Sequence, residues 1–553
     1  MAQEKARKPV ATKAKGPTAA RDDSHHGDIR GAFGTIGEHD HSANTPRTWR
    51  RRVLALAVIM GPGLIVMVGD NDAGGVSTYA AAGQNYGPTL LWTLLLLIPV
   101  LIVNQEMVVR LGAVSGVGHG RLIFERFGNI WGRFAVGDLF VLNFLTIATE
   151  FIGIELGASY FGVPSWIAVP LAGILLVGIT VSGRFETWER SMFVILFGNL
   201  LVIPLMFLCH PQLGAVSHFV LPGIQGGFKS DGMLLIVAIV GTTVTPWQLF
   251  FQQSNVVDKR ITPRWIPYER ADTVIGAGVV VIGAAAIMIA TAYAFAGTPL
   301  RGDFTNALAL AKGLTKFVGP GAGAVFAVLL IDASVVGASA VTLSTSYAFG
   351  DTFGIRNSLH RSWREAKPFY AMFTVLVTLA AGLVLIPNAP LGVITTAVQA
   401  LAGVMLPSAC LFLLFLCNDR DVLGPWVNRS STNVLATLIL GVLLMLSVIL
   451  VVSTIFPNVD VPTLFAALSV VVVVGLAVTM TVNIRAQRNA PRDPREDEDR
   501  ETWRMPSLAL LTRPVKSRTR LIALCTVRGY AIIAMALLLV KAIQVATAGS
   551  GSG

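Results

Sequence analysis

The chain contains few charged residues. Only 14% of its 553 residues are Asp, Glu, Lys or Arg, and 53% are hydrophobic, whereas soluble globular domains carry about 25% charged residues. A large soluble enzyme or binding protein is therefore disfavoured, and an integral membrane protein is expected.

Cysteines and catalytic signatures are also scarce. The four cysteines (Cys209, Cys410, Cys417 and Cys525) show no CxxC spacing and lie in or beside apolar segments, which predicts buried thiols rather than disulfides or a metal site. No HExxH, GxSxG or P-loop pattern is present, which argues against an enzyme. The net charge of +11 is carried by short loops and the two tails, so no nucleic-acid partner is expected.

Apolar segments long enough to span a membrane fill most of the chain. They lie near residues 54–81, 87–111, 134–160, 164–182, 191–209, 232–256, 272–297, 320–349, 369–387, 390–416, 433–456 and 460–484. A further stretch at about 521–547 contains Arg528 and Lys541 and could either span or lie in the interface. Lys and Arg gather in the even-numbered loops, which predicts a multi-pass protein of the plasma or inner membrane with a cytoplasmic N-terminus.

Two of the spans are interrupted by helix-breaking residues. The first reads GPGLIVMVGDNDAGGVSTYAAAG, with Asp70 and Asp72 midway along it, and the sixth reads IVGTTVTPWQLFFQQS, with Pro246 among threonines. A carboxylate at membrane depth is unfavourable unless it is paired or faces water, and broken backbone needs polar partners that lipid lacks. A single kink is more often structural, but two breaks five spans apart are typical of inverted-repeat transporters with a central ion site.

The sequence resembles the natural-resistance-associated macrophage protein (NRAMP) family of divalent metal transporters from about residue 53 to 484. The resemblance is carried by both broken segments, by AVQALAGVMLP in the tenth span and by VNRSSTNVLATLILGV in the eleventh. The resemblance implies an all-α polytopic membrane protein with a LeuT-like fold and about 12–13 spans, the first and sixth broken. Two inverted five-helix repeats would cover about 54–209 and 232–416, with extra spans at 433–484. A divalent metal ion and the lipid bilayer would be its partners, no cofactor is implied, and a monomer is expected.

The segments outside this core are polar. Residues 1–50 are predicted to be a disordered cytoplasmic tail, and residues 485–520 a charged cytoplasmic linker.

The family's site residues can be carried over one by one. The metal-binding aspartate falls on Asp72, and the Pro-Gly-Asn that follows it becomes Ala73, Gly74 and Gly75. In the sixth span the family's alanine, methionine and histidine become Thr242, Thr245 and Trp247, while the tenth-span glutamine is Gln399. The third-span glutamate matches Glu150, and the acid three residues before it is replaced by Ile147. The resemblance thus implies a metal site with the following members: Asp72, Ala73, Gly75, Thr242, Thr245 and Gln399.

These departures from the family pattern predict the substrate. Thr245 replaces a thioether with a hydroxyl, and hard cations prefer oxygen ligands. Gly75 leaves space, and Mg²⁺ usually keeps several waters. Trp247 and Ile147 remove two groups that could accept protons. The pattern resembles the NRAMP-related magnesium transporter branch and predicts carriage of Mg²⁺, and also Mn²⁺, by alternating access without obligatory proton coupling.

Several alternatives stay open. The closest is a proton-coupled Mn²⁺ or Fe²⁺ importer of the NRAMP type; a LeuT-like symporter of another substrate and a channel are more distant. The pathway or gating candidates are Asp70, Glu150, Trp247, Gln248 and Asp332. Asp332 could line the cavity or neutralise a neighbouring helix end. Glu106 and Arg110, one turn apart, are expected to form an ion pair at the interface.

Overall fold

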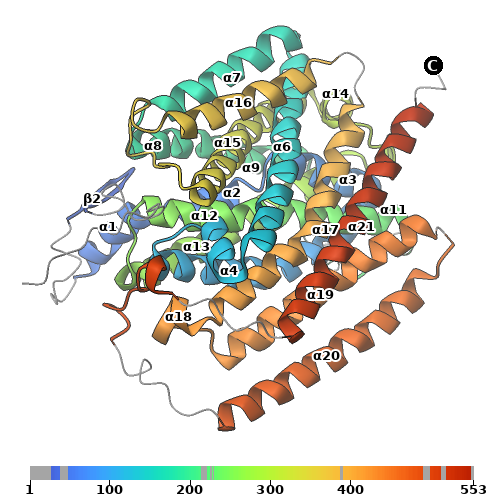
Figure 1. Ribbon diagram of the computed structural model, residues 1–553. Coiled ribbons are helices and arrows are strands. Elements are labelled where there is room, and N and C mark those ends of the chain that lie inside the picture. Colours follow the sequence, from blue (N-terminus) through green and yellow to red (C-terminus); the bar gives the residue numbers. More distant parts are fainter. Residues whose placement is uncertain are drawn as a thin grey trace, which may run out of the picture.

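The computed structural model describes residues 27–37, 48–212, 214, 219, 221–224, 227, 230–386, 390–456, 458–489, 499–511 and 518–549. Most of the predicted N-terminal tail and part of the predicted linker lie outside these ranges. The described chain is almost wholly helical (Figure 1). Within it, eleven helices are long and apolar enough to cross a membrane, or twelve if one bent pair counts as a span.

The first span consists of three short helices. Helix α1 (Trp49–Ile59) and α2 (Pro62–Val68) meet at an angle of 53°, and α3 (Ala73–Tyr86) follows after a break. Gly61, between α1 and α2, has a φ of +153°, a conformation that favours glycine. Pro62 starts α2 at a position where its missing N–H is tolerated. The predicted break therefore falls at residues 69–72, between α2 and α3.

The sixth span breaks once. Helix α11 (Ser230–Thr243) ends before Val244, and α12 (Pro246–Asp258) begins at the predicted proline. Thr245 caps α12: its hydroxyl accepts from the third backbone N–H while the side chain of Gln248 accepts from the Thr245 N–H. Such a reciprocal cap stabilises a helix start in the middle of the membrane, where no water satisfies the free N–H groups.

The other elements are the remaining predicted spans and the short helices between them. They are η3 (Gly87–Leu90), α4 (Leu91–Ser115), α5 (His119–Phe127), α6 (Asn129–Tyr160), α7 (Ser165–Val181), α8 (Phe185–Leu196), η4 (Phe197–Leu201), α9 (Val202–Leu208), η6 (Pro263–Trp265), α13 (Ile266–Ala294), α14 (Ala307–Phe317), α15 (Pro320–Phe353), α16 (Lys367–Val384), α17 (Leu391–Cys417), α18 (Arg420–Leu423), η7 (Gly424–Trp426), α19 (Ser430–Ile455), α20 (Val461–Asn489), η9 (Leu508–Leu510) and α21 (Arg518–Gly549).

Helix packing divides the core into a compact group and the two broken spans. Helices α6, α7, α15 and α16 pack on one another (Figure 1). Helix α3 packs against α13, α6 and α17, α11 against α17, and α12 against α15 and α4. The breaks of the first and sixth spans are therefore enclosed by the third, eighth and tenth spans.

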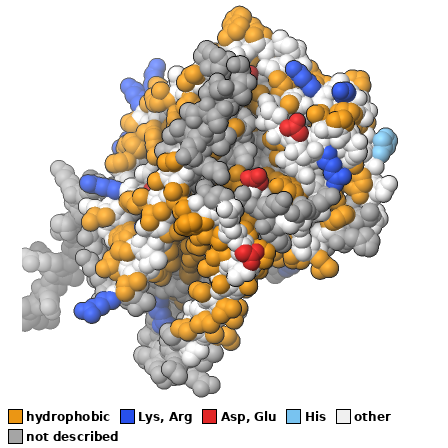
Figure 2. All heavy atoms as spheres, turned by 90° about the vertical axis from the view of Figure 1, so that its right-hand side faces the viewer, with side chains coloured by type: hydrophobic (Ala, Val, Ile, Leu, Met, Phe, Trp, Pro, Cys, Tyr) orange, Lys and Arg blue, Asp and Glu red, His pale blue; other side chains and the backbone are white. Residues whose placement is uncertain are grey.

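The C-terminal helices lie at the periphery. Helix α20 packs against α19 at the edge of the molecule (Figure 1). Only 6% of its most apolar stretch is buried, as expected of a lipid-facing helix. Helix α21 packs along α17, and its Arg528 forms an ion pair with Asp138 of α6. The stretch left open at 521–547 is thus a helix long and apolar enough to span. Hydrophobic side chains cover much of the face in Figure 2, where charged side chains are isolated.

Residues 27–37 differ from the disordered tail that we predicted for 1–50. They form an antiparallel hairpin of β1 (Ile29–Gly31) and β2 (Gly34–Ile36). Ile29 is completely buried, and the Phe33 ring lies 4.9 Å from the ring of Phe193 on α8. The apolar residues of this short segment fold because α1 and α8 give them a surface to pack against, which the polar composition of the tail does not reveal.

Candidate metal centre

Two carboxylates meet at the start of α3. Asp72 is the N-cap residue, and its Oδ1 accepts from the Gly75 N–H at 2.7 Å. Glu150 of α6 accepts from the Ala73 N–H at 3.0 Å through Oε2. Asp72 is 1% exposed and Glu150 is 0% exposed. One oxygen of each, Asp72 Oδ2 and Glu150 Oε1, is buried without a hydrogen-bond partner.

Two further polar groups converge on the same helix start because the two glycines there have no side chains. A Cβ on Gly75 would lie 3.2 Å from Thr242 Oγ1, and one on Gly74 would lie 1.7 Å from Gln399 Nε2. Thr242 Oγ1 and Gln399 Nε2 are also buried without partners. The structure thus brings Asp72, Ala73, Gly75, Thr242 and Gln399 together at the start of α3.

Thr245 is held by the other aspartate. Its hydroxyl lies 3.4 Å from Asp70 Oδ1, and the Gln248 side-chain amide donates to Asp70 Oδ2. Gln248 Oε1 in turn accepts from the Thr245 N–H at 3.0 Å. Asp70 therefore faces the start of α12, whereas Asp72 faces α6, and the unwound residues between α2 and α3 allow this divergence.

Trp247 fills the space beside the end of α2. Its side chain is completely buried, and its Cη2 would lie 3.4 Å from a Cβ on Gly69. Its carbonyl accepts from the Ser344 hydroxyl of α15 at 2.9 Å, and its ring packs against Phe251. The predicted gating position is thus occupied by a large side chain between the two broken spans.

Asp332 lies apart from these residues. Its Oδ2 accepts from Asn199 Nδ2 of η4 at 2.9 Å. The face of α15 that approaches Asp72 and Glu150 instead carries Gly337, where a Cβ would lie 2.6 Å from Glu150 Oε2. Of the two roles left open for Asp332, the structure favours the contact with a neighbouring helix over lining the centre.

Sequence reasoning missed two residues that fix the breaks. Asn71 donates to the Val280 carbonyl of α13 at 3.3 Å, and Tyr79 OH lies 2.8 Å from Thr243 Oγ1. Asn71 stands between the two aspartates, and this position in the polar run was the feature of the sequence that could have indicated its role. Nothing in the local sequence indicates that Tyr79 bonds across to the sixth span.

The chemistry of the centre is that of oxygen ligands. No group of three or more His, Cys, Asp and Glu side chains that could hold a metal occurs within the described residues. Asp70, Asp72 and Glu150 form no ion pair with Lys or Arg across the ranges that the structure describes. Buried carboxylates without a cationic partner are unfavourable, so a cation with hard-oxygen preference would relieve this centre.

Comparison with known proteins defines the family. The family model described as natural resistance-associated macrophage protein-like matches residues 63–453. The chain belongs to the NRAMP family. This NRAMP chain is 25% identical over 419 residues to the divalent metal cation transporter MntH of Deinococcus radiodurans, covering 72% of this chain and 90% of that protein. It is also 25% identical over 414 residues to MntH of Bacillus subtilis, covering 72% of this chain and 93% of that protein.

Solved structures agree on the architecture. The manganese transporter of Eremococcus coleocola, in complex with an aromatic bis-isothiourea substituted compound, matches with a TM-score of 0.60 and 18% identity, over 80% of this chain and 98% of that one. The predicted LeuT-like fold of the NRAMP chain is thereby confirmed. The protein is a multi-pass membrane protein of a transporter family.

Proposed function

We propose that this NRAMP chain is a secondary transporter of divalent metal cations that carries Mg²⁺ and also Mn²⁺ without obligatory proton coupling. The observation that carries the proposal is the meeting of Asp72, Glu150, Thr242 and Gln399 at the start of α3, each with a buried polar atom that lacks a partner. A divalent cation would satisfy the buried oxygens of Asp72, Glu150 and Thr242 together with the negative charge, whereas Gln399 Nε2 is a hydrogen-bond donor and would not bind the ion. The relatives named as divalent metal cation and manganese transporters support the substrate class.

The preference for Mg²⁺ rests on what stands in the two breaks. The side chains there supply carboxylate, hydroxyl and amide groups, and Thr245 stands where the family has a thioether. Oxygen donors suit Mg²⁺ and Mn²⁺ better than soft metals. Gly74 and Gly75 carry no side chains, and Gln399 and Thr242 occupy the space beside them. A bound Mg²⁺ that keeps part of its water shell would meet these side chains through water.

Transport requires the enclosed centre to open to each side in turn. The broken first and sixth spans would rock against the group formed by α6, α7, α15 and α16, which pack on one another. In this mechanism α1 would form the inner half of the first span, and Gly61, at the 53° bend between α1 and α2, would act as its hinge. Trp247, packed between α2 and α12, would have to leave its place for the inner path to open.

A second candidate is proton-coupled Mn²⁺ import. The observation that favours it is the position of Glu150 beside Asp72: a second buried carboxyl group next to the ion can take up a proton when the ion leaves. The loss of an acid at Ile147 and of a histidine at Trp247 favours the uncoupled mechanism instead.

Reconstituted protein separates the two candidates. Uptake of Mg²⁺ and Mn²⁺ into liposomes is followed with fluorescent reporters, alongside an internal pH dye. Saturable uptake of both metals without acidification supports the uncoupled carrier, whereas Mn²⁺ uptake with acidification and no Mg²⁺ uptake supports the second candidate.

The carboxylate assignment is tested in the same liposomes. Asp72→Asn, which keeps the side-chain shape and removes the charge, is expected to abolish uptake. Asp332→Asn serves as the matched control because that acid also lies in a span but contacts Asn199. Saturable uptake by Asp72→Asn would show that Asp72 does not hold the ion.

A further inference from the structure

A cavity lined by charged residues contains none of the residues of the candidate metal centre. It has a volume of about 520 Å³ and opens between α4, α13 and the segment that leads into α19. This volume is within the range of small-molecule sites. Four arginines line it, Arg110, Arg270, Arg429 and Arg500, together with a single acid, Glu106. This excess of positive charge disfavours a passage for divalent cations and favours an anion.

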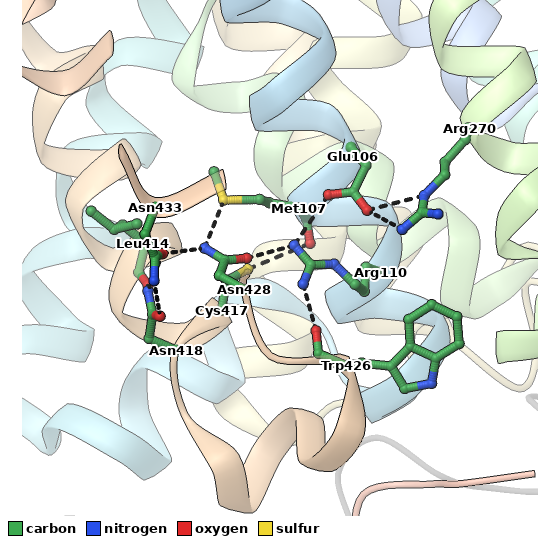
Figure 3. A network of polar contacts seen from close by, with 10 residues as sticks. All are labelled: Glu106, Met107, Arg110, Arg270, Leu414, Cys417, Asn418, Trp426, Asn428 and Asn433. Carbon is green, nitrogen blue, oxygen red and sulfur yellow. Dashed lines mark hydrogen bonds and ion pairs between the residues drawn. The ribbon is translucent and has the colours of Figure 1, made fainter. Parts of the chain in front are cut away.

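A network of polar contacts holds one side of the cavity (Figure 3). Glu106 lies between two arginines, 2.6 Å from Arg270 Nη2 and 3.1 Å from Arg110 Nη2. Arg110 also donates to the Trp426 carbonyl at 2.5 Å and to Asn428 Oδ1 at 2.6 Å. Glu106 balances one positive charge, and these bonds fix the side chains without using the arginines at the mouth.

The arginines at the mouth are available to a ligand. Arg429 and Arg500 are exposed, and neither forms an ion pair among the residues that the structure describes. The Arg500 guanidinium lies 5.9 Å from the centre of the Trp426 ring. The backbone carbonyl of Arg500 accepts a hydrogen bond from Trp426 Nε1 at 2.8 Å. Trp426 thus keeps the Arg500 side chain at the rim.

The start of α19 adds a further feature that suits an anion. Arg429 is the N-cap residue of this 26-residue helix, and no side chain caps its free N–H groups. The hydroxyl-bearing residues Ser431 and Thr432 of its first turn line the cavity. Free N–H groups and the helix dipole attract phosphate groups.

One wall of the cavity is apolar. Ile102 and Val103 of α4 and Leu435 of α19 line it, and Leu435 is 37% exposed. The polar end therefore continues into a hydrophobic surface on membrane-spanning helices. A free inorganic anion would use the polar end alone, whereas a phospholipid would use both.

We propose that this cavity binds the phosphate headgroup of an anionic phospholipid, with its acyl chains along α4 and α19. The loops around it lie on the side that the Lys and Arg distribution assigns to the cytoplasm, and basic pockets between membrane helices on that side are typical sites for acidic lipid headgroups.

The test uses the full-length protein purified in detergent. Phosphatidylglycerol or phosphatidylcholine is added, and lipid retention by native mass spectrometry and the melting temperature are measured. The wild type is expected to retain phosphatidylglycerol and to melt at a higher temperature with it. Arg429→Gln/Arg500→Gln is expected to lose both effects. The control Arg364→Gln/Lys367→Gln removes two exposed charges outside the cavity and is expected to behave as the wild type.

A second variant separates binding from folding. Ser431→Glu places a negative charge in the first turn of α19, where an acid stabilises the helix, yet it would repel a headgroup. Loss of phosphatidylglycerol retention in a variant that melts no lower than the wild type without lipid supports the proposal. Equal retention by the wild type and both cavity variants would overturn it. A full melting shift with inorganic phosphate alone would also overturn it, in favour of a soluble anion.

Discussion

Lys259 Nζ lies 2.7 Å from Glu189 Oε1, and neither side chain is exposed to solvent. The same ammonium donates to the carbonyls of Ile59 at 2.8 Å and Met60 at 2.9 Å, while Glu189 Oε2 accepts from the Ala32 N–H at 2.5 Å. One buried ion pair therefore ties the N-terminal hairpin, the end of α1, α8 and the end of α12 together. It lies at the bend between α1 and α2 in the first span and at the end of α12 in the sixth.

Removal of the cation alone is expected to destabilise the protein. Lys259→Met leaves Glu189 buried without its partner, and breaking a buried pair in this way costs about 3–5 kcal/mol. The double variant Lys259→Met/Glu189→Met removes both charges and is expected to lose less stability. Thermal unfolding of purified protein, followed by tryptophan fluorescence, measures both. A single variant as stable as the wild type would mean that water reaches Glu189.

The close approach of Gln399 to Gly74 gives a test of the tenth span's role. A Cβ on Gly74 would lie 1.7 Å from Gln399 Nε2, so Gly74→Ala must displace the amide from the start of α3. We expect metal uptake to fall at least about tenfold, the equivalent of one lost bond to a charged group. Gly278→Ala, with nothing within 4 Å of its Cβ, is the control in the seventh span. Normal uptake by Gly74→Ala would show that Gln399 does not take part in binding the metal.

Thr245 gives a test of metal preference. Thr245→Met places a thioether beside Asp70, where the hydroxyl now lies 3.4 Å from Oδ1. The ratio of Mn²⁺ to Mg²⁺ uptake is expected to rise on the order of tenfold, which corresponds to about 1.4 kcal/mol.

The matched control for this change is Thr245→Leu. It removes the same helix cap, a loss of about 1 kcal/mol, with a side chain of similar size but without sulfur. If both variants shift the uptake ratio equally, cavity size rather than ligand type sets the preference.

The sequence predicted the two breaks because their causes are local. The polar run Asp70–Asp72 beside Gly74 and Gly75 interrupts the first apolar span, and Pro246 restricts the backbone in the sixth; both features are visible without a structure. The pair Glu106 and Arg110, one helical turn apart, was also predicted and is confirmed at 3.1 Å. The spacing of two residues along one helix is sufficient to predict such pairs.

Contacts between distant segments could not be predicted in the same way. The direction of Asp70 and Asp72 depends on how residues 69–72 unwind, and only the positions of α6 and α12 decide it. Arg270 joins Glu106 across 164 positions of sequence. The hairpin at 27–37 folds on a surface made by α1 and α8, so its own composition predicted disorder.

His119 gives a prediction for the dependence of stability on pH. It lies outside the spans, at the start of α5, where its Nδ1 lies 2.7 Å from Gln253 Oε1 of α12. Burial lowers the pKa of His119 from 6.5 to about 4. The folded state therefore favours neutral His119, and the contribution of this residue to the free energy of unfolding is complete above pH 6.5. This contribution decreases as the pH falls below 6.5, and the decrease ends near pH 4, where His119 is protonated in the folded state too.

Between about pH 7.5 and pH 5 this single group is expected to remove about 2 kcal/mol from the free energy of unfolding. His119→Asn keeps a side-chain N–H for the Gln253 carbonyl oxygen and cannot titrate. Its loss of stability over the same pH interval should be smaller than that of the wild type by this amount, whatever its stability at neutral pH. Thermal unfolding of both proteins at the two pH values makes the comparison, and equal losses would mean that His119 is protonated as readily in the folded state as in the unfolded chain.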